Sequence, residues 1–250
     1  MDALRLNLVS LDPFSWIRLP YQLRWEVVTN NRDLFVDGLF LALRIAVIAL
    51  LIGCVIGILG AFARTSRFRP LRWFVFAYVE VIRNAPLLLL VFIFYYGLPL
   101  SVDRKSWQHE WILRIMPNPE RTFTVVLAIY SGAYLVEIFG AGILSVGKRY
   151  LDAGQSLGLS RWKLARHVTM PIMFRTVLPS LGSTFISLFK DTGIAFFIGV
   201  QELSFAANKI NTDHFRPIEG WAAAGVLYLL TSWLLAFALR FAERQIKWTV

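Results

Sequence analysis

The sequence predicts an all-α membrane protein with five transmembrane helices, and three observations carry this prediction. Apolar residues make up 57% of the 250 residues, and the mean hydropathy is +0.57. Only 17% of the residues are charged, a composition outside the range of soluble globular domains. Three uncharged runs of 19 or 20 residues match the length that a helix needs to cross a bilayer; they are residues 45–63, 84–102 and 220–239.

Two further stretches are apolar but interrupted by charge. Residues 122–147 contain one charged side chain, that of Glu137, and residues 176–201 contain Lys190 and Asp191. Membrane helices tolerate such side chains where they face protein or water. The five spans are therefore predicted at residues 36–63, 74–99, 122–147, 176–201 and 220–240.

Basic residues are distributed unevenly between the two sides of the membrane. With five spans, residues 64–72, residues 148–175 and the segment after residue 239 share one side, which holds 13 Lys and Arg against two acids. The other side holds ten of each. Because the basic side faces the cytoplasm, we expect the N-terminus outside and the C-terminus in the cytoplasm. Topology thus explains the formal net charge of +10, and no nucleic-acid partner is expected.

Residues 1–33 are expected to form an extracytoplasmic or interfacial N-terminal segment. Their charges are scattered and they lack a compact apolar core, so we expect no cleavable signal peptide. Aromatic residues mix with arginine between Phe14 and Trp25, a pattern typical of a segment at the membrane interface. A disordered arm is the alternative.

The sequence lacks the residue patterns of a catalytic or metal site. Cys54 is the single cysteine, which excludes an intrachain disulfide, and the three histidines are scattered over different predicted loops. Residues 142–148 have the G-x-x-x-x-G-K spacing of a phosphate-binding loop, but Arg149 stands in place of the Ser or Thr that would hold magnesium, and a membrane helix rather than a buried strand precedes them. We therefore expect no enzyme activity, cofactor or metal in this chain.

A proline interrupts the second predicted span near its cytoplasmic end. Pro86 has no backbone N–H to donate, so the helix is expected to kink or to restart there. Glu80 and Arg83 lie one turn apart just before it and can form an ion pair on one helix face. A surface pair beside a helix start is the simplest interpretation.

Glu137, Lys190 and Asp191 are candidate functional residues because they lie in the middle of predicted spans. An unpaired charge there costs about 3 kcal/mol or more, so each is expected to face the protein interior or water and to find a partner. Two interpretations stay open. Lys190 could pair with Asp191 or Glu137 to hold helices in register, or the three residues could line a route across the membrane or its gate.

The loop between the third and fourth spans, residues 148–171, is too long for a turn and too patterned for a linker. Gly158 can end a first short helix in the left-handed conformation, and Ser160 can cap a second helix. Two short helices bent at a glycine would form a compact knob suited to docking against another protein. The alternative is an amphipathic helix lying on the lipid surface.

This loop resembles the "EAA" loop of bacterial ABC importer permeases, whose pattern is E-A-A, three residues, G, nine residues, and I-x-L-P. Here Asp152, Ala153 and Gly154 stand at E-A-A, Gly158 at the glycine, and residues 168–171 (V-T-M-P) at the end. The four departures are Asp for Glu, Gly for the second Ala, Val for Ile and Met for Leu.

Other segments resemble the polar amino-acid branch of that family, the histidine-, glutamine- and glutamate-type permeases, and the resemblance covers about residues 34–247. These segments are residues 83–88 (R-N-A-P-L-L), 95–99 (Y-Y-G-L-P), 133–138 (A-Y-L-V-E-I), 158–162 (G-L-S-R-W), 185–192 (F-I-S-L-F-K-D-T) and 198–203 (I-G-V-Q-E-L).

The resemblance implies a type I ABC importer permease fold over residues 34–250, in a multi-pass protein of the bacterial cell (inner) membrane. It implies three kinds of partner beyond the lipid bilayer itself. These are a second permease subunit, identical or homologous, two cytoplasmic ABC ATPase subunits that bind ATP and magnesium, and an extracytoplasmic binding protein that delivers the amino acid.

The resemblance also implies roles for individual residues. Seven residues of the loop are expected to couple the chain to the ATPase: Asp152, Ala153, Gly154, Leu157, Gly158, Leu159 and Arg161. Glu137, Lys190 and Asp191 are expected at the substrate pathway or its gate. The outer loop at residues 101–121, with Trp107 and Trp111 one turn apart, is a candidate dock for the binding protein or an interfacial anchor.

Residues 78–86 resemble glutamate/aspartate-type permeases, which favours acidic or amide amino acids as the substrate. Three alternatives remain. They are an importer of another small polar solute, such as an osmolyte or peptide, an ATP-independent channel, and an integral membrane enzyme. The last would need a polar catalytic cluster that the sequence does not supply.

Overall fold

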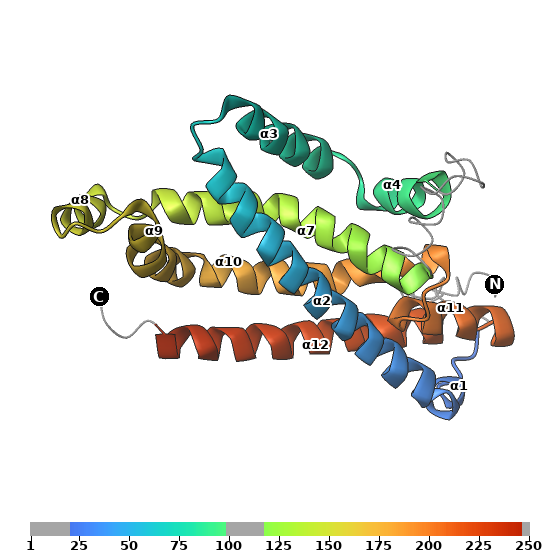
Figure 1. The fold of residues 1–250 in the computed structure, drawn as a ribbon. Helices are drawn as coiled ribbons and strands as arrows, with labels where there is room; N and C mark the ends of the chain where they lie inside the picture. The colour runs from blue at the N-terminus through green and yellow to red at the C-terminus, as the bar shows by residue number, and fades with distance from the viewer. Residues whose placement is uncertain (1–20, 99–117, 247–250) are drawn as a thin grey trace, which may run out of the picture.

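The computed structural model describes residues 21–98 and 118–246, and every regular element in these ranges is a helix (Figure 1). The all-α fold class is thus confirmed for the described residues. Four of the helices are long and apolar enough to cross a membrane, or five if one bent pair counts as a span. Residues 1–20 of the expected N-terminal segment lie outside the described ranges, as do residues 101–117 of the outer loop, which include Trp107 and Trp111.

The helices follow one another in the order α1 (Glu26–Asn30), α2 (Arg32–Arg64), α3 (Arg69–Asn84), α4 (Leu87–Phe92), η2 (Ile93–Gly97), α7 (Pro119–Leu144), α8 (Lys148–Ser156), α9 (Arg161–Leu164), η3 (Ala165–Thr169), α10 (Met170–Asp191), η4 (Thr192–Ile198), α11 (Leu203–His214) and α12 (Pro217–Ile246). The segments η2 and η3 are π-helical, and η4 is a 3₁₀ helix.

Small residues let α2 pack closely across α7, the helix at the centre of the fold. A Cβ added to Gly53 would lie 2.2 Å from Ser131 Oγ, and one added to Gly57 would lie 2.5 Å from Leu135 Cβ. No larger side chain fits at these two glycines without a shift of the neighbouring atoms. Glycines spaced by four residues are a common means of bringing membrane helices together.

The second apolar stretch is broken at Pro86, as the sequence predicts. The axes of α3 and of the α4–η2 helix differ by 107°, and Ala85 between them is extended with ψ 135°. Pro86 is the N-cap residue of α4. On the α3 side of the break, the Tyr78 hydroxyl donates a 2.6 Å hydrogen bond to the carbonyl of Ile129 and so attaches α3 to α7.

A buried carboxyl, that of Glu202, joins α11 to α12. It caps α11 by accepting hydrogen bonds from the backbone N–H groups of Ser204 (2.8 Å) and Phe205 (3.1 Å), and it accepts a third from the Tyr228 hydroxyl (2.8 Å). Glu202 lies between two candidate spans, which end at Ile198 and begin at Pro217. Burial raises the pKa of this carboxyl to about 7.

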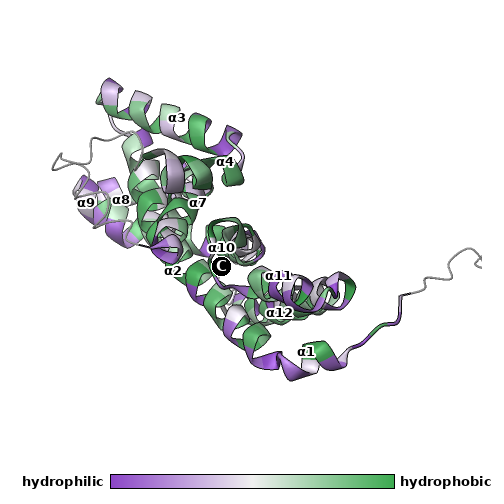
Figure 2. Ribbon diagram, turned by 90° about the vertical axis from the view of Figure 1, so that its right-hand side faces the viewer, coloured by the Kyte–Doolittle hydropathy of each residue, from purple (hydrophilic) through white to green (hydrophobic). Residues whose placement is uncertain are grey.

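The helices place two polar regions at opposite ends of the molecule. Figure 1 shows α8, α9 and the end of α12 at one end, and α1, α11 and the start of α12 at the other. In Figure 2, hydrophilic residues gather on α8 and α9, whereas α2 and α7 are largely hydrophobic. The loop at residues 148–171 therefore lies at one end of an apolar bundle.

Candidate functional site

The loop at residues 148–171 folds as two short helices joined at a left-handed glycine, as predicted. The helix α8 ends with a 3.1 Å hydrogen bond from Leu159 N–H to the carbonyl of Gly154, across Gly158 at φ +71°. Such a bond around a left-handed residue is the Schellman ending of a helix. Ser160 begins α9, and its hydroxyl accepts a long 3.5 Å bond from Lys163 N–H. We call residues 148–164 the knob.

The two short helices of the knob pack against each other and are not loosely connected. Gly154, which replaces the second alanine of the EAA pattern, is buried. A Cβ at this position would lie 2.4 Å from Leu164 Cδ1 and 3.5 Å from Leu159 Cδ1. The missing methyl group therefore makes room for Leu164 of α9 against α8.

The outer surface of the knob carries large apolar side chains that nothing in the described residues covers. Leu157 is 81% exposed and Trp162 is 72% exposed. Apolar groups of this size on an otherwise polar surface are typical of a protein-binding site. Four of the other residues predicted to couple are also exposed, namely Asp152, Ala153, Gly158 and Arg161, while Leu159 is half-buried and Gly154 is buried. Trp162 was not predicted, although a tryptophan among basic residues is a visible signal.

A polar cavity of about 390 Å³ lies between α7 and α10. It contains hydroxyl groups from both helices and one carboxyl group, that of Asp191. The lining residues are Tyr130, Ser131, Tyr134 and Ile138 of α7, and Ser183, Thr184, Ser187, Leu188 and Asp191 of α10. A cavity with this lining can hold a small molecule that both donates and accepts hydrogen bonds.

An ion pair between Arg83 of α3 and Glu137 of α7 stands beside this cavity. The Arg83 guanidinium also lies 5.1 Å from the centre of the Tyr134 ring, within range of a cation–π contact. The hydroxyls of Tyr134 and Tyr130 are 3.1 Å apart. Two tyrosines that line the cavity thus connect it to the charged pair.

The sequence suggested different partners for these charges. Arg83 pairs with Glu137 and not with Glu80. Glu80 instead accepts a 3.0 Å hydrogen bond from the Asn84 side chain of its own helix. Lys190 is exposed and forms no ion pair within residues 21–98 and 118–246.

The structure brings two of the three predicted pathway residues close to the cavity. Asp191 lines it, and Glu137 is connected to it through Arg83 and Tyr134. Sequence reasoning missed the hydroxyl residues Ser183 and Ser187. A usable signal was present, because positions 183, 187 and 191 recur every four residues and so share one helix face.

The helical fold and the family match together define the membrane-spanning subunit of a transport system. The chain belongs to the family described as binding-protein-dependent transport system inner membrane component, which matches residues 53–248. This membership confirms the predicted ABC importer permease and its predicted place in the inner membrane.

Relatives with established names support the amino-acid branch. The chain is 36% identical to the glutamine transport system permease protein GlnP of Escherichia coli (strain K12), over 90% of this chain and 99% of that protein. It is 30% identical to the probable glutamine ABC transporter permease protein GlnM of Bacillus subtilis (strain 168), over 89% and 97% of the two chains. A crystal structure of an amino acid ABC transporter with histidines matches with a TM-score of 0.79 and 27% identity, over 90% of this chain and all of that one.

Proposed function

We propose that this chain is the permease subunit of an ATP-driven importer of glutamine, delivered by an extracytoplasmic binding protein. The observation that carries the proposal is the 36% identity to a glutamine permease along nearly the whole of both chains. The amide side chain also agrees with the preference for acidic or amide substrates that residues 78–86 indicate.

The proposed topology has five spans, with α3 and the α4–η2 helix counted as one. The N-terminus lies outside and the C-terminus in the cytoplasm, in the type I permease arrangement. Two observations support this orientation. The knob and the end of α12 lie at the same end of the molecule (Figure 1), and both carry basic residues that favour the cytoplasmic side.

In the proposed assembly, the knob docks into a cytoplasmic ATPase subunit. A second permease subunit, identical or homologous, completes the pathway, and the two ATPase subunits bind ATP and magnesium. Leu157 and Trp162 supply apolar contact area, and Asp152 and Arg161 supply charges at the rim. ATP drives the transport cycle by binding one conformation of the assembly more tightly than the other.

The cavity between α7 and α10 is the proposed substrate pathway. Asp191 complements the α-ammonium group of an amino acid, and the hydroxyls of Ser187 and Thr184 can donate to and accept from a carboxamide. Glu137, held by Arg83, is proposed to act at the gate, together with the exposed Lys190. Because the cavity is one wall of a subunit interface in this proposal, substrate would also contact the second permease subunit.

Competition uptake tests the substrate. The importer, with its ATPase and binding protein, is reconstituted in vesicles, and uptake of labelled glutamine is measured against an excess of glutamine, glutamate, histidine or lysine. We expect glutamine to compete most strongly and uptake to require ATP. Saturable uptake of basic amino acids alone, or uptake without ATP, would contradict the proposal.

A further inference from the structure

The last long helix, α12, is the least covered of the four helices that could each cross a membrane alone. Only 6% of its most apolar stretch is buried, compared with 61% for α7. It runs along one edge of the bundle in Figure 1. On its outer side the structure contains a groove of about 790 Å³. Among the described residues, those that line it all belong to α12: Leu230, Trp233, Leu234, Phe237, Arg240, Phe241 and Arg244.

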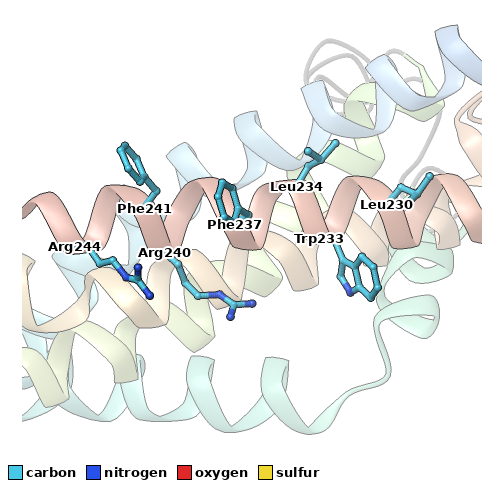
Figure 3. Close-up of a pocket in the computed structure, with 7 residues that line it drawn as sticks. All are labelled: Leu230, Trp233, Leu234, Phe237, Arg240, Phe241 and Arg244. Atoms are coloured by element: carbon cyan, nitrogen blue, oxygen red, sulfur yellow. The ribbon is translucent and has the colours of Figure 1, made fainter.

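The groove combines an apolar part with a charged end. Trp233 and Phe237 are 69% and 73% exposed and offer a broad hydrophobic surface. Arg240 is the first charged residue after the uncharged run of residues 220–239, which is about 30 Å long as a helix. The two arginines therefore lie where the hydrocarbon core gives way to the headgroups. Figure 3 shows Arg240 and Arg244 leaving α12 on the same side.

Neither arginine has an acidic partner among the residues that the structure describes. Arg240 uses its Nε–H to reach the carbonyl of Ala236 at 3.3 Å, which leaves both of its terminal nitrogens available. The neighbouring acid, Glu243, is directed towards α10, where its Oε1 lies 3.6 Å from the Cβ position of Gly182, and it forms no ion pair with either arginine. Within the part of the chain that the structure describes, two cations one helical turn apart thus face outward without an ion-pair partner.

We propose that residues 230–244 of α12 bind one anionic phospholipid, with the phosphate on Arg240 and Arg244 and an acyl chain along Trp233 and Phe237. Basic groups at the cytoplasmic end of a membrane helix are a recurring lipid headgroup site. The assignment to the cytoplasmic leaflet rests on the proposed orientation. The proposed preference for an anionic phospholipid does not depend on that orientation.

Charge complementarity favours a lipid over a second copy of this chain. In a two-fold symmetric contact through this groove, the same patch would face itself, and Arg240 and Arg244 would meet their own copies. On the basic side of the sequence, residues 64–72, 148–175 and 240–250 contain only Asp152 and Glu243 as acids. A phosphate group supplies the negative charge that a second copy would lack.

The test compares lipid retention by the full-length chain purified in mild detergent. The protein is incubated with equal amounts of phosphatidylglycerol and phosphatidylcholine, and native mass spectrometry counts the bound lipids. We expect wild type to prefer phosphatidylglycerol by on the order of tenfold, and R240Q/R244Q to lose this preference. The control R64Q/R67Q removes two exposed arginines at the end of α2, on the same side, and should keep it.

Two results would overturn the proposal. One is equal retention of phosphatidylglycerol by wild type and by R240Q/R244Q; if that variant does not fold, R244Q alone at the exposed helix end serves for the comparison. The other is a disulfide-linked dimer of Leu234→Cys in a Cys54→Ala background, which would place a second copy in the groove. The readout involves neither glutamine nor ATP, so a failure of the proposed transport function would leave it unaffected.

Discussion

Arg83 of α3 and Glu137 of α7 form an ion pair across 54 positions of the sequence, and the side chains are 36% and 39% exposed. The pair therefore connects two helices without being buried by this chain alone. The break at Pro86 directly follows α3, so the pair also fixes the position of that bend relative to α7. A contact of this kind is suited to being broken and reformed as the helices move.

Neutralising one member of this pair should impair transport. Glu137→Gln leaves Arg83 unpaired beside Tyr134, and we expect glutamine uptake to fall by roughly tenfold, equivalent to about 1.4 kcal/mol. Uptake into vesicles, measured together with substrate-stimulated ATP hydrolysis, checks this. The exchange R83E/E137R should restore part of the activity if pairing is what counts.

The matched control is Glu120→Gln, on the same helix. Glu120 also pairs with an arginine of another helix, Arg44 of α2, at 2.5 Å. That pair lies at the other end of α7, away from the cavity. Its loss should leave glutamine uptake within about twofold of the wild-type value. Equal effects of Glu137→Gln and Glu120→Gln would refute a role at the gate.

Gly158 should not tolerate a side chain. It has φ +71° with nothing within 4 Å of a Cβ position, so the cost of Gly158→Ala is conformational rather than steric. A left-handed non-glycine residue costs about 1–2 kcal/mol. We expect the ATPase subunit to co-purify several-fold less well with this variant.

The control for the knob is Gly140→Ala in α7, where a Cβ also meets nothing within 4 Å but φ is not positive. This change should leave ATPase association intact. If Gly158→Ala and the bulkier Gly158→Val both assemble with the ATPase and transport normally, the knob is not the coupling element.

Asp191 should be needed for substrate rather than for assembly. Asp191→Asn keeps the shape of the cavity wall but removes the charge proposed to meet the α-ammonium group. We expect uptake to fall by roughly tenfold or more, while the ATPase subunit still co-purifies. Asp37→Asn, an exposed position on α2, should behave as wild type. A normal KM for glutamine in Asp191→Asn would exclude this carboxyl from the binding site.

The Glu202 carboxyl should make stability depend on pH. Its pKa in the folded chain, about 7, lies above the ordinary value of 4.5, so the folded state holds the proton more tightly. Its contribution is therefore complete below pH 4.5 and is lost as the pH rises to about 7, by at most about 3 kcal/mol. Thermal unfolding in detergent between pH 5 and pH 8 should show this decline.

Glu202→Gln resembles the protonated carboxyl and should unfold near the wild-type temperature at pH 5. Above pH 7 its stability should equal or exceed that of wild type, because no charge is buried beside Tyr228. A parallel decline of both proteins over this range would mean that another group is responsible.

The sequence alone predicts features that depend on local chemistry. It does not predict features that depend on how the helices pack against one another. The helix break follows from the missing N–H of Pro86, and the knob follows from Gly158 and Ser160; both could be read from one short stretch. The partner of Arg83 could not, because Glu137 is brought to it only when α3 packs on α7. The cavity likewise needs the relative rotation of α7 and α10, which no single helix pattern specifies.

From Arg161 to Ile198 the chain is helical without a break, and α9, η3 and α10 continue into η4. Arg161 belongs to the knob and Asp191 to the cavity, and the 30 residues between them span about 45 Å as helix. A displacement of the knob therefore reaches the cavity through hydrogen-bonded helix, since no loop lies between them, although the π-helical η3 and Pro179 are points where this helix can bend. Inserting several glycines at η3 would uncouple the two ends, so that the ATPase subunits still hydrolyse ATP while glutamine is no longer transported.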